Sequence, residues 1–188
     1  LSLMLQNLDT GVLIVGSQRS SDRPSTDAKM NMYSASKFLT QTNFTGIGVC
    51  MHETSSDDTC NILPPQKVRK MHTSKRNAFK PVNKEKLGAV NYQTGEIEEN
   101  FETGKKAEYS KETEVDQNVG VLKVRPGMNP EEIEFLIEQD YNGVIVEGTG
   151  LGHMPVNAFD EKTQHHAEIL DKISELAENT AVVMTSQC

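Results

Sequence analysis

Residues 16–31 read G-S-Q-R-S-S-D-R-P-S-T-D-A-K-M-N, and they join a short apolar run to a segment with helical periodicity. The run before them, residues 12–15 (V-L-I-V), has the length and composition of a fully buried strand. After the polar stretch, one face of a predicted helix carries Ala28, Met32, Ala35 and Leu39. A strand, a polar loop and a helix in this order indicate an α/β fold, in which ligands bind beyond the carboxyl ends of the strands.

The polar loop contains several hydroxyls, two arginines and two aspartates, and Pro24 restricts its backbone. Ser25 or Thr26 is expected to cap the N-terminus of the following helix. Taken alone, the loop also has the composition of an ordinary polar connection between a strand and a helix.

Composition places the chain among globular proteins, with 36% apolar and 24% charged residues in 188. The net charge of −8 argues against a general nucleic-acid coat protein and against adhesion to anionic membranes. No apolar run approaches the ~20 residues that cross a bilayer, and the first residues do not form a signal peptide. Three cysteines, an odd number, favour reduced thiols and a cytoplasmic location.

The first half of the chain continues with a second buried strand at residues 46–51. Pro64-Pro65 is predicted to form a hairpin-like turn between residues 60–63 and residues 67–70. After it, helix or irregular structure is expected through Ala78 and Phe79. Residues 89–101 form a predicted short hairpin around Thr94-Gly95-Glu96. The pair His52-Glu53 has no second histidine at helical spacing, so we expect no metal site there.

The second half alternates strands and helices regularly. Strands are predicted at residues 119–124, 143–147 and 181–184, with one helix from Asn129-Pro130 to about Asn142 and another over residues 160–179. This order implies parallel pairing with right-handed crossovers. The faces expected to point inward carry Ile133, Leu136 and Ile137 on the first helix, and Leu170, Ile173, Leu176 and Ala177 on the second.

The basic stretch at residues 67–76, K-V-R-K-M-H-T-S-K-R, has three interpretations. It is a solvated basic face, a patch that contacts RNA phosphates, or a site that controls the pKa of a lysine. A lysine that acts as a base needs its pKa lowered from about 10.4 by roughly three units, and burial and neighbouring cations act in that direction.

The glycine loop at residues 148–152 follows a strand, but His153 replaces the last glycine of a dinucleotide fingerprint. The next helix begins only after Pro155 and Phe159, whereas a phosphate-cradling loop runs directly into its helix. We therefore expect the glycines to permit close backbone approach to a ligand or to a neighbouring subunit, and not to bind a nucleotide.

Three stretches resemble the type I/II L-asparaginase family, and within it most closely the D subunits of archaeal glutamyl-tRNA(Gln) amidotransferases. They are residues 16–27 (G-S-Q-R-S-S-D-R-P-S-T-D), 68–76 (V-R-K-M-H-T-S-K-R) and 147–153 (E-G-T-G-L-G-H). Plain asparaginases carry related G-A-M-R-P, V-T-K-T-N-T and G-x-G-N-G-N stretches. The resemblance covers nearly the whole chain, in order and with compatible spacing.

The resemblance implies an asparaginase-like α/β fold with two parallel-sheet domains. Residues 1–102 correspond to the C-terminal part of the N-terminal domain, residues 103–118 to a linker, and residues 119–188 to the first part of the C-terminal domain. We therefore expect the chain to be a fragment cut at both ends, with the N-terminal domain incomplete and the C-terminal domain partial.

In function, the resemblance implies a glutaminase that hydrolyses glutamine to glutamate and ammonia. Its partner, the E subunit of the amidotransferase, uses the ammonia with ATP and magnesium to convert Glu-tRNA(Gln) to Gln-tRNA(Gln). The implied partners are thus the E subunit, a second copy of the asparaginase-like domains and, through the complex, tRNA(Gln). No cofactor or metal is implied for this chain itself.

The resemblance also assigns roles to residues. Lys70 matches the family's catalytic lysine, with Arg69 and Arg76 as candidate tuning charges. Backbone groups around Ser17 match the position that touches the substrate amide, and Asp27 and Asn31 match positions that support the loop of the site. The family's loop that reaches the neighbouring subunit's substrate is matched by Gly150, Gly152 and His153. In this loop His153 stands where related asparaginases have an asparagine.

The sequence departs from the family in one important respect. The nucleophilic threonine lies in a T-G-G-T-I-type loop, and a second threonine and an aspartate lie in an H-G-T-D-T segment. Neither segment occurs in this chain, and His52-Glu53-Thr54 is no substitute. We therefore predict that these 188 residues alone have no amidase activity.

Two other functions stay open, a stand-alone L-asparaginase or glutaminase and a non-catalytic module that docks a partner or tRNA. The position of Lys70 discriminates between catalysis and docking. A catalytic Lys70 is expected to be buried near Ser17 with a depressed pKa, whereas an RNA contact is expected to be exposed.

Overall fold

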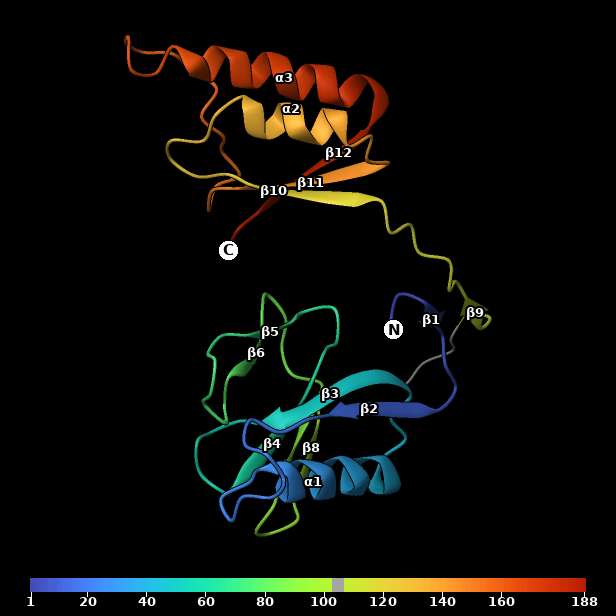
Figure 1. Cartoon of the computed structure of the whole chain (residues 1–188). Helices are drawn as coiled ribbons and strands as arrows, with labels where there is room; N and C mark the ends of the chain where they lie inside the picture. The colour runs from blue at the N-terminus through green and yellow to red at the C-terminus, as the bar shows by residue number, and fades with distance from the viewer. Residues whose placement is uncertain (103–106) are drawn as a thin grey trace. The chain divides into compact units, whose positions relative to one another are not determined.

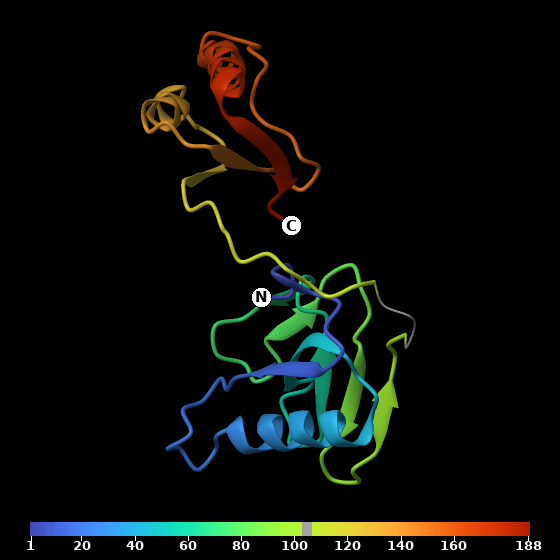
Figure 2. The ribbon, with the colours of Figure 1, turned by 90° about the vertical axis from the view of Figure 1, so that its right-hand side faces the viewer.

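The computed structural model describes residues 1–102 and 107–188, and their contacts divide the chain into two compact units, Leu1–Thr113 and Glu114–Cys188. Each unit has its own sheet and its own core (Figures 1 and 2). The predicted linker at residues 103–118 includes four residues outside the described range, so its boundaries stay a prediction. Its described part contains β9 (Ser110–Lys111), which pairs with β1 (Leu5–Gln6).

Unit 1 (Leu1–Thr113) is built on a five-stranded sheet in the order β2-β3-β4-β7-β8. Only β2 and β3 are parallel, and the other neighbours are antiparallel. The α/β class predicted from the sequence is confirmed, but the expectation of a parallel first sheet is wrong. The strands are β2 (Gly11–Val15), β3 (Gly46–His52), β4 (Thr59–Leu63), β7 (Gly88–Asn91) and β8 (Ile97–Glu99).

The helix α1 (Ala28–Gln41) connects β2 to β3 and packs against the sheet, as Figure 1 shows. The Thr26 hydroxyl accepts the N–H of Ala28 at 3.1 Å, so of the two predicted capping residues it is Thr26 that contacts the helix start. The predicted inward face is partly wrong, because Met32 is 58% exposed. The buried stripe is instead Met30, Asn31, Ser34, Ala35 and Phe38, which places a polar residue under the helix.

The core of unit 1 centres on Phe38, which is fully buried. Its ring meets Phe44 and Phe101 edge to face, with centroids 5.6 and 5.8 Å apart. Gly88 lies under the same ring, because a Cβ added there would come within 2.7 Å of a Phe38 ring carbon. Such edge-to-face contacts stabilise a core beyond the burial of apolar area.

Three details of the predictions for this unit are corrected. The run at residues 12–15 is not fully buried, because β2 lies at an edge of the sheet and Ile14 is 44% exposed. The segments around Pro64-Pro65 do not form a hairpin with each other, because β4 pairs with β3 and β7. The following strand, β5 (Val68–Lys70), pairs with β6 (Phe79–Pro81), a strand in place of the expected helix or irregular structure. The predicted hairpin of β7 and β8 is confirmed.

Unit 2 (Glu114–Cys188) has the predicted alternation of strands and helices. Its strands pair in parallel in the order β10-β11-β12, and both helices lie on the same side of this sheet in Figure 1. Apolar residues from the helices and the sheet, including Ile133, Val146 and Ile169, form the core between them. The elements are β10 (Val119–Lys123), α2 (Glu131–Glu138), β11 (Gly143–Gly148), α3 (His165–Asn179) and β12 (Ala181–Ser186).

The start and the inward face of α3 differ from the prediction. The Asp160 carboxylate accepts the N–H groups of Lys162 and Thr163 at 3.0 Å, so these residues form a turn and the helix begins at His165. Such side-chain bonds to the backbone compete with helix formation. Ile169 and Leu176 are buried, whereas Leu170 is 49% exposed. Within the described residues, no helix is both long and apolar enough to cross a membrane.

The buried face of α1 is tested by two substitutions on that helix. We expect Phe38→Ala to lower the free energy of unfolding of unit 1 by about 3–5 kcal/mol, because it empties the centre of the core. Met32→Ala, on the exposed side, is expected to change it by less than about 0.5 kcal/mol. Urea unfolding followed by circular dichroism measures both, and equal losses for the two variants would contradict the assigned face.

Candidate functional site

The loop that follows β2 is fixed by a buried carboxylate. Asp27 is fully buried, and both of its carboxylate oxygens accept the backbone N–H of Gln18 at 3.0 Å. One of them also accepts the N–H of Arg19 at 3.0 Å. Charge-assisted bonds from backbone amides are stronger than neutral ones. Asp27 therefore holds the loop at two consecutive residues, Gln18 and Arg19.

Asn31, one turn further along α1, continues this network. Its amide nitrogen donates to the carbonyl oxygen of Gly16 at 2.9 Å and to the Asp27 carboxylate at 3.1 Å. Because both of these partners are acceptors, the other side-chain atom is the oxygen, and this oxygen lies 2.6 Å from Nδ1 of His52. It follows that Nδ1 of His52 carries a hydrogen and donates it to Asn31.

The central strands β3 and β4 provide the base of the network. His52 and Cys60 are directly opposite each other in the antiparallel pair, and both are fully buried. The Cys60 thiol donates to the side-chain oxygen of Asn31 at 3.3 Å, and the Cys50 thiol donates to the main-chain oxygen of Asn31 at 3.5 Å. Two strands in the middle of the sheet thus hold Asn31, and Asn31 holds the loop.

These contacts change the acid–base properties of the buried groups. Burial raises the pKa of Asp27, but the backbone N–H groups of Gln18 and Arg19 outweigh it, and the pKa lies below its usual value. For His52, burial lowers the pKa, but the contact with Cys60 and the charge of Asp27 raise it overall. The pKa of the Cys60 thiol is lowered, chiefly by the hydrogen bond with the neighbouring Cys50 thiol. Burial raises this pKa, and the contact with His52 lowers it further.

A second loop, residues 71–78, closes against the first. The Gln18 side chain donates to the carbonyl oxygen of Lys75 at 2.8 Å, and Arg76 donates to the carbonyl oxygen of Ser25 at 2.5 Å. Arg76 also pairs with Asp57, whose carboxylate lies 3.7 Å from Nε2 of His52. Between the two loops lies a pocket of about 510 Å³, lined by Gln18, Arg19, Ser20, Arg23, Ser25 and Ser74.

The structure brings some of the predicted site residues together and separates others. Asp27 and Asn31 belong to the network described above, and Ser17 lies exposed between Gly16 and Gln18, two loop residues that the network binds. Lys70 is exposed at the end of β5, and its ammonium lies 5.9 Å from the centroid of the Phe79 ring. It lines a different hollow of about 350 Å³, together with Met71, His72 and Thr73.

The exposure of Lys70 in this chain differs from the burial near Ser17 that a catalytic lysine is expected to show. The physical reason is local. Among the described residues β5 pairs with β6 alone, and the Lys70 side chain lies over Phe79 and not inside the core.

In unit 2, the glycine loop after β11 closes on itself. Thr149 accepts the N–H of His153 with its hydroxyl at 3.1 Å and donates its own N–H to the carbonyl oxygen of His153 at 3.0 Å. Gly152 has φ of 78°, and a Cβ on Gly148 would lie 2.8 Å from the Gly152 backbone. The glycines are therefore required by the tightness of the loop itself. Gly150, also in this loop, has the exposed Cys188 thiol beside it.

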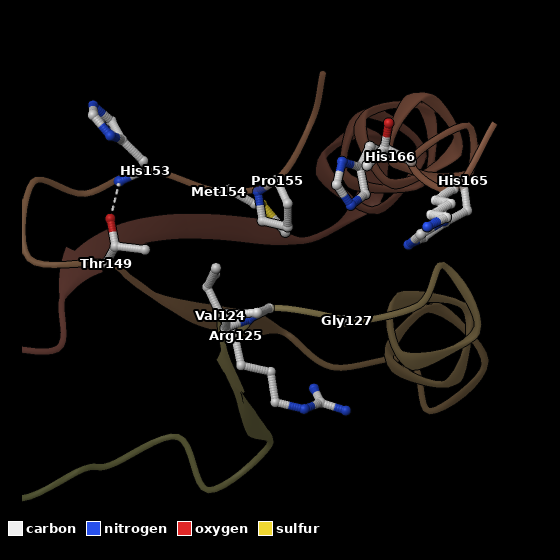
Figure 3. A pocket seen from close by; sticks show the side chains of 12 residues that line it. Val124, Arg125, Gly127, Thr149, His153, Met154, Pro155, His165 and His166 are labelled. Atoms are coloured by element: carbon white, nitrogen blue, oxygen red, sulfur yellow. Dashed lines mark hydrogen bonds between the residues drawn. The ribbon is translucent and has the colours of Figure 1, made fainter. Parts of the chain in front are cut away.

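A pocket of about 530 Å³ adjoins the glycine loop. Figure 3 shows the His153 side chain on one side, near Thr149, and His165 and His166 on the other, with Met154 and Pro155 between them in this view. His166 contacts the carbonyl oxygen of Asn157 at 2.9 Å through Nδ1. Histidines and apolar side chains thus share this pocket, but the predicted role of His153 toward a neighbouring subunit stays a prediction.

His52 and Cys60 are members of the site that sequence reasoning missed, because it treated His52 only as a possible metal ligand. A signal was present for His52, a polar and ionisable residue at the end of an otherwise apolar strand. Such residues are buried only with partners, and here the partner is Asn31.

Comparison with known proteins gives consistent matches. Residues 1–103 match the family model "Asparaginase, N-terminal", and residues 118–188 match "Glutaminase/Asparaginase C-terminal domain". The chain is 38% identical over 192 residues to the D subunit of the Pyrococcus furiosus glutamyl-tRNA(Gln) amidotransferase, covering 100% of this chain and 41% of that protein. The corresponding protein of Methanococcus maripaludis is also 38% identical, with 43% of its length covered.

Among solved structures, the thermostable L-asparaginase from Thermococcus kodakarensis is similar, with a TM-score of 0.82 and 26% identity. The match covers 100% of this chain and 52% of the asparaginase chain. The chain thus spans about half of this structure and 41–43% of the two amidotransferase proteins.

The role of Asp27 predicts a specific dependence of stability on pH. Its folded-state pKa is lowered, so its stabilisation is complete above the unfolded pKa of about 3.9 and is lost as the pH falls through the folded value. We expect Asp27→Asn to lower the unfolding free energy of unit 1 at pH 7 by about 1–3 kcal/mol. Its stability should also decline less steeply than that of the wild type below about pH 5.

The matched control is Asp22→Asn, which removes an exposed carboxylate from the same loop. This variant is expected to keep the stability and pH profile of the wild type. A profile of Asp27→Asn that superimposes on the wild-type profile at every pH would show that Asp27 does not hold the loop.

Proposed function

This chain belongs to the asparaginase family, and from that premise we propose that it is part of an amidohydrolase that releases ammonia from glutamine. More specifically, we propose that this amidohydrolase is the glutaminase subunit of a tRNA-dependent amidotransferase. In this proposal the partner, the E subunit of the complex, binds ATP and magnesium and uses the ammonia to convert Glu-tRNA(Gln) to Gln-tRNA(Gln). The asparaginase-like domains pair with a second copy, and the complex works in the cytoplasm.

The observation that carries this proposal is how the backbone around Ser17 is held. Asn31 binds the carbonyl oxygen of Gly16, and Asp27 binds the N–H of Gln18, so Ser17 is fixed from both sides. Within the described part of the chain, Ser17 itself forms no hydrogen bond, and it is exposed. Fixed backbone groups that are free to bond are suited to orienting a substrate amide.

Lys70 is the proposed base. In the proposed reaction Lys70, with a second threonine and an aspartate, removes the proton of a threonine hydroxyl, whose oxygen attacks the side-chain amide carbon of glutamine. The C–N bond then breaks, the nitrogen takes up that proton and leaves as ammonia, and water hydrolyses the acyl-threonine ester to glutamate. In this proposal Arg69 and Arg76, which lie in the same segment, are the candidate charges that tune the site. For this role Lys70 must become less exposed than it is in the chain described above.

Two other candidates each have one observation in their favour. The structural similarity to an L-asparaginase supports a stand-alone asparaginase or glutaminase. The exposure of Lys70 supports a docking module in which the basic segment contacts a partner or tRNA. A stand-alone asparaginase or glutaminase would release ammonia without a partner. A docking module would release no ammonia at all.

The catalytic assignment is tested in the complete gene product together with its partner subunit and Glu-tRNA(Gln). We expect Lys70→Ala to reduce ammonia release from glutamine at least about 100-fold, because general bases contribute 10²–10⁴-fold to rates. Lys67→Ala, which removes a neighbouring exposed lysine, should leave the rate nearly unchanged. Full activity of Lys70→Ala would remove Lys70 from the mechanism, and vigorous asparagine hydrolysis without a partner would favour the asparaginase.

A second test uses the 188-residue chain by itself. Because the threonine segments of the family do not occur in it, we expect no ammonia release from glutamine or asparagine above the rate of a buffer blank. Circular dichroism of the same sample establishes that the chain is folded. Ammonia release that disappears in Lys70→Ala would show that this chain carries a nucleophile of its own.

A further inference from the structure

We propose that the pocket between the loop at residues 16–26 and the loop at residues 71–78 binds a phosphate group. The pocket has a volume of about 510 Å³ and belongs to unit 1 alone. It is distinct from the hollow that Lys70 lines. The proposal goes beyond amide hydrolysis and does not depend on it.

The lining of the pocket is rich in donors. Arg19 and Arg23 contribute positive charge, and three serines, Ser20, Ser25 and Ser74, contribute hydroxyls. Among the described residues no carboxylate lines it, although the chain as a whole has a net charge of −8. Within the same part of the chain, neither guanidinium forms an ion pair or a hydrogen bond, so both are available to an anion. Planar guanidinium groups bind phosphate through paired hydrogen bonds.

Two acidic residues near the pocket are already occupied. The Asp27 carboxylate is fully buried, accepts the N–H groups of Gln18 and Arg19, and does not line the pocket. Asp57 is paired with Arg76 at 2.5 Å. Asp22, the acidic residue of the 16–26 loop itself, is exposed and does not line the pocket, so the lining itself offers an anion cations and hydroxyls.

Both walls are held in place before any ligand binds. On one wall, Asp27 fixes Gln18 and Arg19, and the Thr26 hydroxyl donates to the carbonyl oxygen of Arg19 at 2.9 Å. On the other wall, Nδ1 of His72 accepts the N–H groups of Ser74 and Lys75 at 3.1 and 3.2 Å.

Two hydrogen bonds then join these walls, from Gln18 to Lys75 and from Arg76 to Ser25. A preorganised pocket loses less conformational entropy on binding than a mobile loop does.

A phosphate fits this arrangement better than a carboxylate. The two arginines and two of the serines come from one loop and Ser74 from the other, so donors surround the pocket from more than one side. A tetrahedral phosphate accepts bonds in several directions, whereas a carboxylate accepts them in one plane. The phosphate is either free, as in a small phosphorylated molecule, or part of an RNA backbone, and the experiment separates these sources.

The test titrates the 188-residue chain with inorganic phosphate at constant ionic strength and follows backbone amide resonances by NMR. We expect saturable shifts at Arg19, Ser20 and Ser74. The double variant Arg19→Gln/Arg23→Gln is expected to weaken binding at least about tenfold, because it removes two charge-assisted contacts. The control Lys29→Gln/Lys84→Gln removes the same charge from sites elsewhere in unit 1 and should weaken binding less than about twofold.

A second titration uses a short single-stranded RNA at several salt concentrations. If the phosphate belongs to RNA, the arginine variant lowers the slope of log K against log salt by about 1.4, which corresponds to two lost phosphate contacts. If neither phosphate nor RNA gives a saturable response at these residues, or if both double variants weaken binding equally, the pocket is not a phosphate site. Because the readout is binding, a negative result leaves the amidohydrolase proposal unaffected.

Discussion

The buried carboxylate of Asp27 is the constraint on which the site in unit 1 depends. A charged group removed from water costs several kcal/mol unless hydrogen bonds compensate it. Here the compensation comes from the backbone N–H groups of Gln18 and Arg19 and from the amide of Asn31. Because these donors lie on the loop after β2 and on α1, the carboxylate is stable only when the loop adopts one conformation. Burial of the Asp27 carboxylate therefore favours the single loop conformation that supplies these donors.

Asn31 extends this constraint to the centre of the sheet. It touches the loop through Gly16, the helix start through Asp27, and the two central strands through His52 and Cys60. These contacts satisfy the buried polar atoms of Asn31, whereas Nε2 of His52 is buried without a hydrogen-bond partner among the described residues. The consequence for function is that the loop, where substrate contact and phosphate binding are proposed, is positioned by buried residues of β3 and β4.

The sequence predicted the elements of this fold better than it predicted their faces. Parallel pairing in unit 2 follows from the spacing of apolar runs, and the structure confirms it. Periodicity places the inward face of α1 on Met32 because it counts apolar residues, whereas the buried position is Asn31, whose partners are distant in sequence. The pairing of His52 with Cys60 depends on strand register, which the turn between β3 and β4 sets together with the buried faces of both strands, so the apolar runs alone do not predict it.

The most direct test of this account is the rate of amide hydrogen exchange in the loop after β2. If the Asp27 carboxylate holds the loop, the N–H groups of Gln18 and Arg19 will exchange much more slowly than that of Ser21, which lies in the same loop. Exchange of all three at the rate of an unstructured peptide would contradict it, because the buried carboxylate would then have no stable partners.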